Sequence, residues 1–222
     1  MRFQVTLLAS GLAGCGAIML CSCGSSSPPK EPSAAQLQSS MQAAIQQANS
    51  VHVNGTATGS KAPVGINIGL NRAGDLAGTV TESGATLQLT SVDRKVYVKA
   101  NQAFLHQYNV PASACSTFCG HWIELPASSA SQFNQVSMKN LTGLPSNVKL
   151  TKAGSTTVNG QSAWVLKAPD GTVVDVASTG TPYPLRVKSA TQQGMLNYSQ
   201  WNSVPKPTAP PANQVINLSG LK

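Results

Sequence analysis

Alternation between apolar and polar side chains is the feature that most constrains how this chain can fold. Between Val64 and Leu70, every second residue is Val, Ile or Leu, and the residues between them are Gly or Asn. A period of two residues places the apolar side chains on one face of a β-strand. Similar segments at 76–82, 85–92, 95–99, 156–158, 162–167, 172–178, 185–190, 195–201 and 215–218 predict about ten strands in total.

The sequences between these segments indicate how the strands are connected. Ser83–Gly84 and Asp93–Arg94 each leave two residues between strand segments, which is typical of antiparallel hairpins; the chain also turns at Asn159–Gly160, and 71–74 forms a longer turn. A sheet of this size tends to curl, and its apolar face needs a cover. We therefore expect an α+β fold, in which a curved antiparallel sheet of about ten strands forms a half-barrel with helices on its concave face.

Three segments could supply those helices. The first follows Ser33, a suitable N-cap, and carries apolar residues at helical spacing at Leu37, Met41, Ala44, Ile45 and Ala48. Weaker helical patterns occur at 100–108 and 130–141. The latter two segments interrupt the strand pattern, so we expect them to lie across the sheet.

The N-terminus has the pattern of an export signal. Arg2 is followed by an uncharged stretch over 5–19 and then by a polar run rich in Ser and Pro. Residues 20–23 resemble a bacterial lipobox, which implies cleavage before Cys23 and diacylglycerol attachment to it. Residues 12–15 fit the lipobox more closely, so Cys15 is the alternative; we favour Cys23 because that cleavage leaves a polar tether. An uncleaved membrane anchor is disfavoured, because the apolar run falls short of the about 18–20 residues that a spanning helix needs.

These assignments divide the chain into a signal peptide at 1–22, a flexible tether at 23–34 and one folded domain at 35–222. The formal net charge is +8, but the 15 basic residues never form a run of three and no basic stripe with interleaved aromatics is seen. We therefore expect no nucleic-acid partner. A monomer on the outer face of the cytoplasmic membrane is the expected state.

Two cysteines lie four residues apart, at Cys115 and Cys119. In an exported chain such a pair is typical of a disulfide. The alternative is a metal site with His121 and His106 as further ligands, but zinc sites usually need four ligands at recognisable spacing. We favour the disulfide and expect no metal.

Catalytic motifs are missing from the sequence. It contains no G-x-S-x-G elbow, no H-E-x-x-H helix and no phosphate-binding G-x-x-x-x-G-K-[ST] loop. The seven acidic residues show no pairing typical of a glycosidase. We expect neither an enzyme nor a cofactor.

Several short segments, in their order along the chain, resemble landmarks of a known family. They are 50–55, 96–99, 122–126, 182–186, 198–201 and 211–215. Together they resemble the LppX/LprG family of actinobacterial lipoproteins, whose domain is similar to the lipoprotein carrier LolA. The cysteine loop at 115–119 is not a general feature of that family. The resemblance implies a half-barrel over helices that encloses an apolar cavity for acyl chains.

The function implied is the binding or transport of an acyl lipid or glycolipid across the cell envelope. We expect the cavity to be lined by apolar residues of the first helix and the strands: Leu37, Met41, Ile45, Ile66, Ile68, Leu87, Leu89, Val96, Val98, Leu185 and Val187. The alternative is a ligand-free envelope lipoprotein that acts through surface contacts with a protein or a cell-wall polymer.

Overall fold

A computed structural model describes residues 31–58, 62–107, 109–130, 136–138, 140, 148–190 and 194–217. The predicted signal, both candidate lipidation cysteines and most of the tether lie outside the described residues, as does most of the predicted helix at 130–141. Every element below belongs to one structural unit that begins at Pro32.

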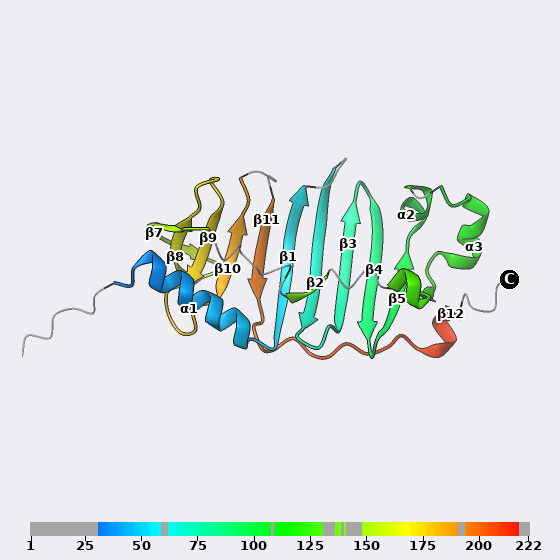
Figure 1. Ribbon diagram of the computed structural model, residues 1–222. Coiled ribbons are helices and arrows are strands. Elements are labelled where there is room, and N and C mark those ends of the chain that lie inside the picture. Colours follow the sequence, from blue (N-terminus) through cyan, green and yellow to red (C-terminus); the bar gives the residue numbers. More distant parts are fainter. Residues whose placement is uncertain are drawn as a thin grey trace, which may run out of the picture. The chain divides into compact units, whose positions relative to one another are not determined.

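The described strands form a single sheet (Figure 1). Its order is β12-β6-β5-β4-β3-β2-β1-β11-β10-β9-β8-β7, and only β12 and β6 pair in parallel. The strands are β1 (Ser50–Thr58), β2 (Pro63–Asn71), β3 (Leu76–Glu82), β4 (Ala85–Val92), β5 (Lys95–Ala100), β6 (Trp122–Glu124), β7 (Thr151–Val158), β8 (Gln161–Lys167), β9 (Val173–Ala177), β10 (Pro184–Lys188), β11 (Met195–Ser199) and β12 (Val215–Asn217).

This sheet has 12 strands, so the predicted count of about ten is too low. Two strands were not predicted: β6, and β1, which lies in the middle of the sheet and pairs with β2 and β11. Alternation is weak in β1, because Gly55 falls where an apolar residue would continue the pattern begun by Val51 and Val53.

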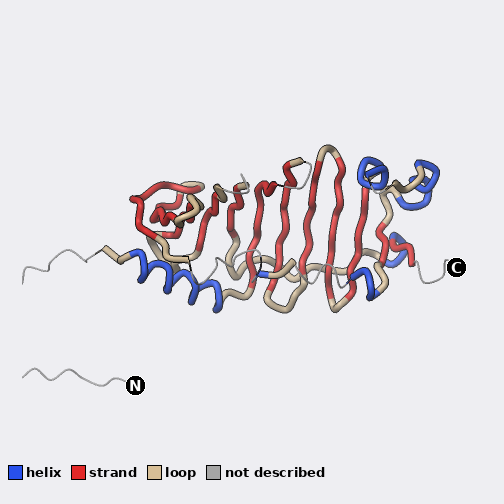
Figure 2. Tube along the Cα trace, turned by 45° about the horizontal axis from the view of Figure 1, so that its top comes forward, coloured by secondary structure: helices blue, strands red, loops and turns tan. Residues whose placement is uncertain are grey.

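The predicted half-barrel is also wrong, because the sheet is neither closed nor strongly curled. Figure 2 shows the strands following one another as an open row. β-Bulges, which insert an extra residue into one strand, are a common cause of strong bending in a sheet. Register shifts occur between β9 and β10 and between β7 and β8, whereas the pairs from β1 to β5 run in unbroken register.

The first predicted helix is confirmed as α1 (Ala34–Gln47). Ser33 forms a capping box with Gln36: its Oγ accepts from the Gln36 amide at 3.2 Å, and its own amide donates to Gln36 Oε1 at 2.9 Å. The buried face carries Leu37 and Met41, which pack against strands β8 and β9. The sequence thus specifies both where this helix begins and which side it buries.

The other helices that can be delimited within the described residues are short. They are α2 (Gln102–Gln107), α3 (Cys115–Phe118) and α4 (Ala127–Ala130), with 3-10 turns at Ala112–Ala114 and Ala212–Gln214. The helix α2 matches the pattern predicted at 100–108, but it has no buried residue. In Figure 1, α2 and α3 lie beyond β5 rather than across the sheet. The prediction that this segment covers the concave face is therefore wrong.

The two-residue hairpin turns are confirmed. Ser83 and Gly84 both have positive φ (49° and 84°), as do Asn159 and Gly160 (48° and 81°). Positive φ at both central residues is the mark of a type I′ turn, whose twist matches that of the strands it joins. Asp93 and Arg94 form the same kind of turn between β4 and β5.

Register gives the sheet two chemically different faces. On the face that α1 covers, Val53, Ile68, Leu89 and Val98 lie near one level of β1, β2, β4 and β5; we call this the apolar face. Successive side chains of a strand point to opposite sides. The adjacent residues Asn54, Asn67 and Gln88 therefore lie on the other face, which we call the polar face.

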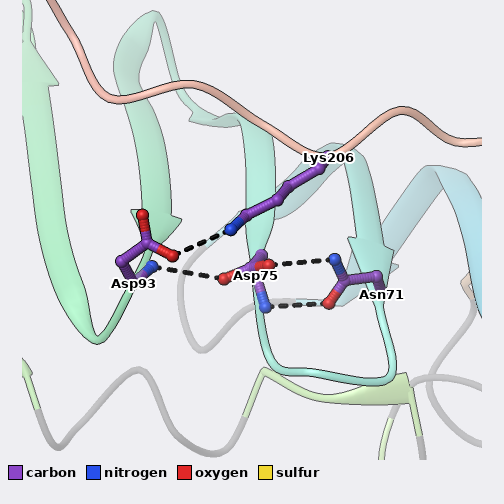
Figure 3. Close-up of polar contacts among 4 residues, drawn as sticks. All are labelled: Asn71, Asp75, Asp93 and Lys206. Carbon is purple, nitrogen blue, oxygen red and sulfur yellow. Dashed lines mark hydrogen bonds and ion pairs between the residues drawn. The ribbon is translucent and has the colours of Figure 1, made fainter.

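After β11, residues 201–211 run past the ends of the strands, across the width of the sheet, to β12; we call these residues the strap (Figure 1). Below, an edge of the sheet means the row of strand ends on one side. The amide of Val204 donates to Ser50 Oγ at 3.1 Å, and Lys206 Nζ lies 2.8 Å from Asp93 Oδ1. The Asp93 amide donates to Asp75 Oδ1 at 3.3 Å, which ties the strap to the turns at that edge (Figure 3).

Candidate functional site

The apolar face is organised around two clusters. The first joins buried residues of β1 to β5 and β11 with Ala48, the C-cap of α1, and Met138, which lies between β6 and β7: Ala48, Val51, Val53, Ile68, Leu70, Leu76, Leu89, Val96, Val98, Met138 and Tyr198. The second joins α1 to β8 and β9: Leu37, Met41, Leu150, Leu166, Ala168, Val174 and Val176. Val187 packs against both clusters and so connects them.

Ten of the eleven predicted lining residues lie in or against these two clusters. Ile68, Leu89, Val96 and Val98 belong to the first, and Ile66 and Leu87 pack against it. Leu37 and Met41 belong to the second, with Ile45 and Val187 packed against it. The eleventh residue, Leu185, packs in a separate third cluster with Val158, Ala163 and Ala177.

On strands β1 and β2, burial on the apolar face decreases with distance from the strap. Near the strap, Val51 and Leu70 are 0% and 2% exposed, and one step along, Val53 and Ile68 are still buried. One step further, at Ile66, the side chain is only half-buried. On these two strands the apolar face is thus sealed at the strap and becomes accessible toward the opposite strand ends, whereas on β4 and β5 it stays closed there, because Ala85 and Ala100 are 1% and 6% exposed.

At that half-buried level, apolar side chains form a row across the sheet. Register aligns them through direct pairing of neighbouring strands from β10 to β4. We call this the half-buried row: Val187, Leu196, Ile66, Val80 and Leu87, all of intermediate burial. Five strand spacings of about 4.8 Å give it a length of about 24 Å.

Gly55 occupies the position of β1 in the half-buried row, between Leu196 and Ile66. Its φ is +151°, and a Cβ at this position would come within 2.0 Å of the carbonyl oxygen of Met195. No larger residue fits without moving β11. The row therefore lacks a side chain at one of its six strands, β1.

Sequence reasoning missed two members of the row, Val80 and Leu196. Val80 lies between two threonines and Leu196 precedes Asn197, in segments that were predicted as strands, so their face could have been read from the period. Their place in the row could not be read from the sequence, because it depends on the pairing of Val80 with Ile66 and of Leu196 with Gly55.

Tyr198 lies beside the row and is 5% exposed. Burial raises the pKa of its hydroxyl well above the ordinary value of 10.0. Its ring stacks at 6.3 Å from Trp201, which in turn lies 4.4 Å from Tyr183 in a nearly parallel stack. These aromatic rings close the sealed end of the apolar face where the strap begins.

The disulfide predicted between Cys115 and Cys119 is confirmed. It closes the loop that carries α3, between α2 and β6. Within the part of the chain that the structure describes, no three His, Cys, Asp or Glu side chains gather as metal ligands would. Across those same residues, no helix is both long and apolar enough to span a bilayer.

An open, almost entirely antiparallel sheet with one long helix on its apolar face defines the class of this domain as α+β. No family model matches the sequence, and no curated protein matches it. Among solved structures, lipoproteins with the same arrangement are similar to it.

The crystal structure of LprF from Mycobacterium bovis matches with a TM-score of 0.55 and 13% identity, covering 79% of this chain and 96% of LprF. The Mycobacterium tuberculosis lipoprotein LppX matches with a TM-score of 0.51 and 17% identity, covering 77% of this chain and 98% of LppX. At such identities the likeness is one of fold, and it confirms the structural resemblance predicted from the sequence.

Proposed function

We propose that this protein binds the acyl chains of a lipid or glycolipid on the apolar face of its sheet. The half-buried row is the observation that carries this proposal. Its five aliphatic side chains are apolar yet not fully packed, and leaving such surface in water costs free energy that a bound hydrocarbon would recover. The fold shared with the lipoproteins LprF and LppX supports the same reading.

The dimensions of the row suit a membrane lipid. The hydrocarbon core of a bilayer is about 30 Å thick, so one acyl chain spans about 15 Å in its leaflet. The row, at about 24 Å, is long enough to accept such a chain across the strands. Each methylene buried there contributes about 0.8 kcal/mol.

The direction of the burial gradient indicates how a lipid would be held. Tails would enter at the ends of β1 and β2 opposite the strap and lie against Ile66 and Leu87, because Val51 and Leu70 leave no exposed surface near the strap. The polar headgroup would remain at the open edge, in contact with water. No covalent chemistry and no cofactor are needed for this activity.

In the proposed setting, the domain is a monomer held at the outer face of the cytoplasmic membrane by a diacylglycerol on Cys23. The tether then gives it access to membrane lipid. The lining set comprises the ten predicted residues in the two connected clusters together with Val80 and Leu196.

The test is to fill the row at its centre. Ile66→Trp should take the space of about four methylenes and cost about 3 kcal/mol of binding free energy, which is roughly a hundredfold in affinity. Thr81→Trp is the matched control, because Thr81 is exposed on the polar face of the neighbouring strand. Binding is measured by titration with a fluorescent fatty acid, and native mass spectrometry identifies lipid that co-purifies.

Circular dichroism verifies that both variants are folded. Weaker binding in the Ile66 variant alone supports the proposal. Equal affinity in the wild type and both variants would place any lipid elsewhere. A protein that carries no lipid from its own host and binds no fatty acid would refute the proposed function.

A further inference from the structure

The polar face carries a continuous row of hydrogen-bonding side chains at a single level. Register pairs each member directly with the next, from β5 through β4, β3, β2, β1 and β11 to β10. We call it the amide row: Lys99, Gln88, Thr79, Asn67, Asn54, Asn197 and Arg186. Six strand spacings of about 4.8 Å make it about 29 Å long.

Contacts within the face hold parts of the row in place. His52 Nε2 lies 2.7 Å from Asn67 Oδ1, which leaves the amide N–H groups of Asn67 available as donors. Asn197 Nδ2 donates to the backbone oxygen of Asn54 at 3.4 Å, which leaves Asn197 Oδ1 available as an acceptor. The row therefore offers both donors and acceptors in a fixed order.

Charge on this face is unbalanced. The two carboxylates that the described strands place on this face are paired, Glu124 with Lys95 at 3.0 Å and Asp175 with Arg186 at 2.6 Å, and Asp75, in the turn beside the strap, accepts hydrogen bonds from Asn71 Nδ2 and the Asp93 amide. Lys99 at one end of the row, and Lys188 on β10 at the other, have no ion-pair partner among the described residues. The face therefore carries an uncompensated positive charge at both ends of its amides.

The strap borders the amide row on one side. Val204 lies over Gly69, because a Cβ at Gly69 would come within 2.8 Å of Val204 Cγ1. Gly69 is two residues from Asn67 on the same face of β2. On the other side, Thr56, Thr81 and Met195 lie one step further along and are exposed.

We propose that the amide row binds an anionic polysaccharide laid across the strands. Amides and hydroxyls at regular spacing match the alternating donors and acceptors of sugar hydroxyl groups. Lysines at the two ends match carboxylate or phosphate groups on the same polymer. This second surface lies on the opposite side of the sheet from the half-buried row, so it is independent of the proposed lipid binding.

Affinity electrophoresis of the intact protein in gels containing polygalacturonate tests this proposal, with neutral dextran as the comparison polymer. The wild type should be retarded by polygalacturonate and not by dextran. The triple variant Asn54→Ala/Asn67→Ala/Asn197→Ala keeps the net charge and should lose about tenfold in affinity, because it removes hydrogen bonds alone.

Two double variants distinguish the effect of positive charge on the polar face from the effect of the net charge of the protein. Lys99→Gln/Lys188→Gln should lose about tenfold in affinity, whereas Arg94→Gln/Lys149→Gln removes the same charge from exposed positions outside the row and should retain it. Equal losses in the two pairs would overturn the proposal, as would a triple variant that binds like the wild type. Retardation by DNA that matches polygalacturonate and ignores the triple substitution would mean a general attraction for polyanions, which also refutes it. Fatty-acid binding should be unchanged in every variant.

Discussion

The ion pair between Asp175 and Arg186 gives the sharpest test of the packing described above. Arg186 Nε lies 2.6 Å from Asp175 Oδ2, at a register shift between β9 and β10. The side chain of Asp175 is 2% exposed and that of Arg186 is 21% exposed. Substituting Arg186 by Met would therefore leave a carboxylate buried without its cation.

The size of the expected loss of stability follows from the distance between the two charges and from their burial. Two unit charges at 2.6 Å interact by about 6 kcal/mol at an effective dielectric constant of about 20. Desolvation cancels part of this, and breaking a buried pair from one side costs about 3–5 kcal/mol. Because Arg186 is partly exposed, we expect Arg186→Met to lower the free energy of unfolding by about 3 kcal/mol, near the lower end of that range.

The double variant Asp175→Asn/Arg186→Met removes the unpaired charge and serves as the control. It should lose only about 1–2 kcal/mol, the cost of a buried polar group without a full set of partners. Urea unfolding followed by tryptophan fluorescence measures all the variants, including Asp175→Asn alone, and completes a double-mutant cycle. If the double variant is as unstable as Arg186→Met, charge burial is not the cause and the reasoning fails.

Two further predictions concern the strap and the buried phenol. Gly69→Ala should lower stability by about 1 kcal/mol, because its Cβ would push against Val204, and Gly69→Ala/Val204→Ala should restore most of that loss in the same urea assay. An unrescued double variant would mean that strain lies elsewhere. Tyr198 keeps its proton in the folded state at pH values where the unfolded chain releases it, since burial raises its pKa above 10.0. The stability that the protonated Tyr198 contributes is complete below about pH 10. Above that pH, the free energy of unfolding falls by up to about 1.4 kcal/mol per pH unit. Stability of Tyr198→Phe should therefore fall less steeply than that of the wild type between about pH 10 and 11.5, and parallel curves would contradict this assignment.

Much of this architecture follows from local signals. The Ser33 capping box, the helical spacing of Leu37 and Met41, and the positive-φ turn at Asn159–Gly160 depend on residues a few positions apart, so the sequence alone predicts them. The alternation from Val64 to Leu70 likewise assigns each side chain to one of two faces.

The wrong predictions concern features for which the local signal is weak, or which depend on contacts between distant parts of the chain. Gly55 interrupts the alternation of β1, yet that strand lies in the middle of the sheet because β2 and β11 pair with it. The sheet stays open because its bulges are confined to two strand pairs, which the composition of the strands does not reveal. The place of Leu185 in a separate cluster follows from one of those bulges.

By itself, the sequence determined which side chains are apolar, which face of each strand carries them, and where hairpins turn. Only the tertiary structure decided which of those side chains stay half-buried and which polar residues stand in one row. The physical reason is that exposure and alignment depend on register between strands far apart in the chain, such as β1 with β11. Both the proposed lipid surface and the proposed glycan surface are products of that register.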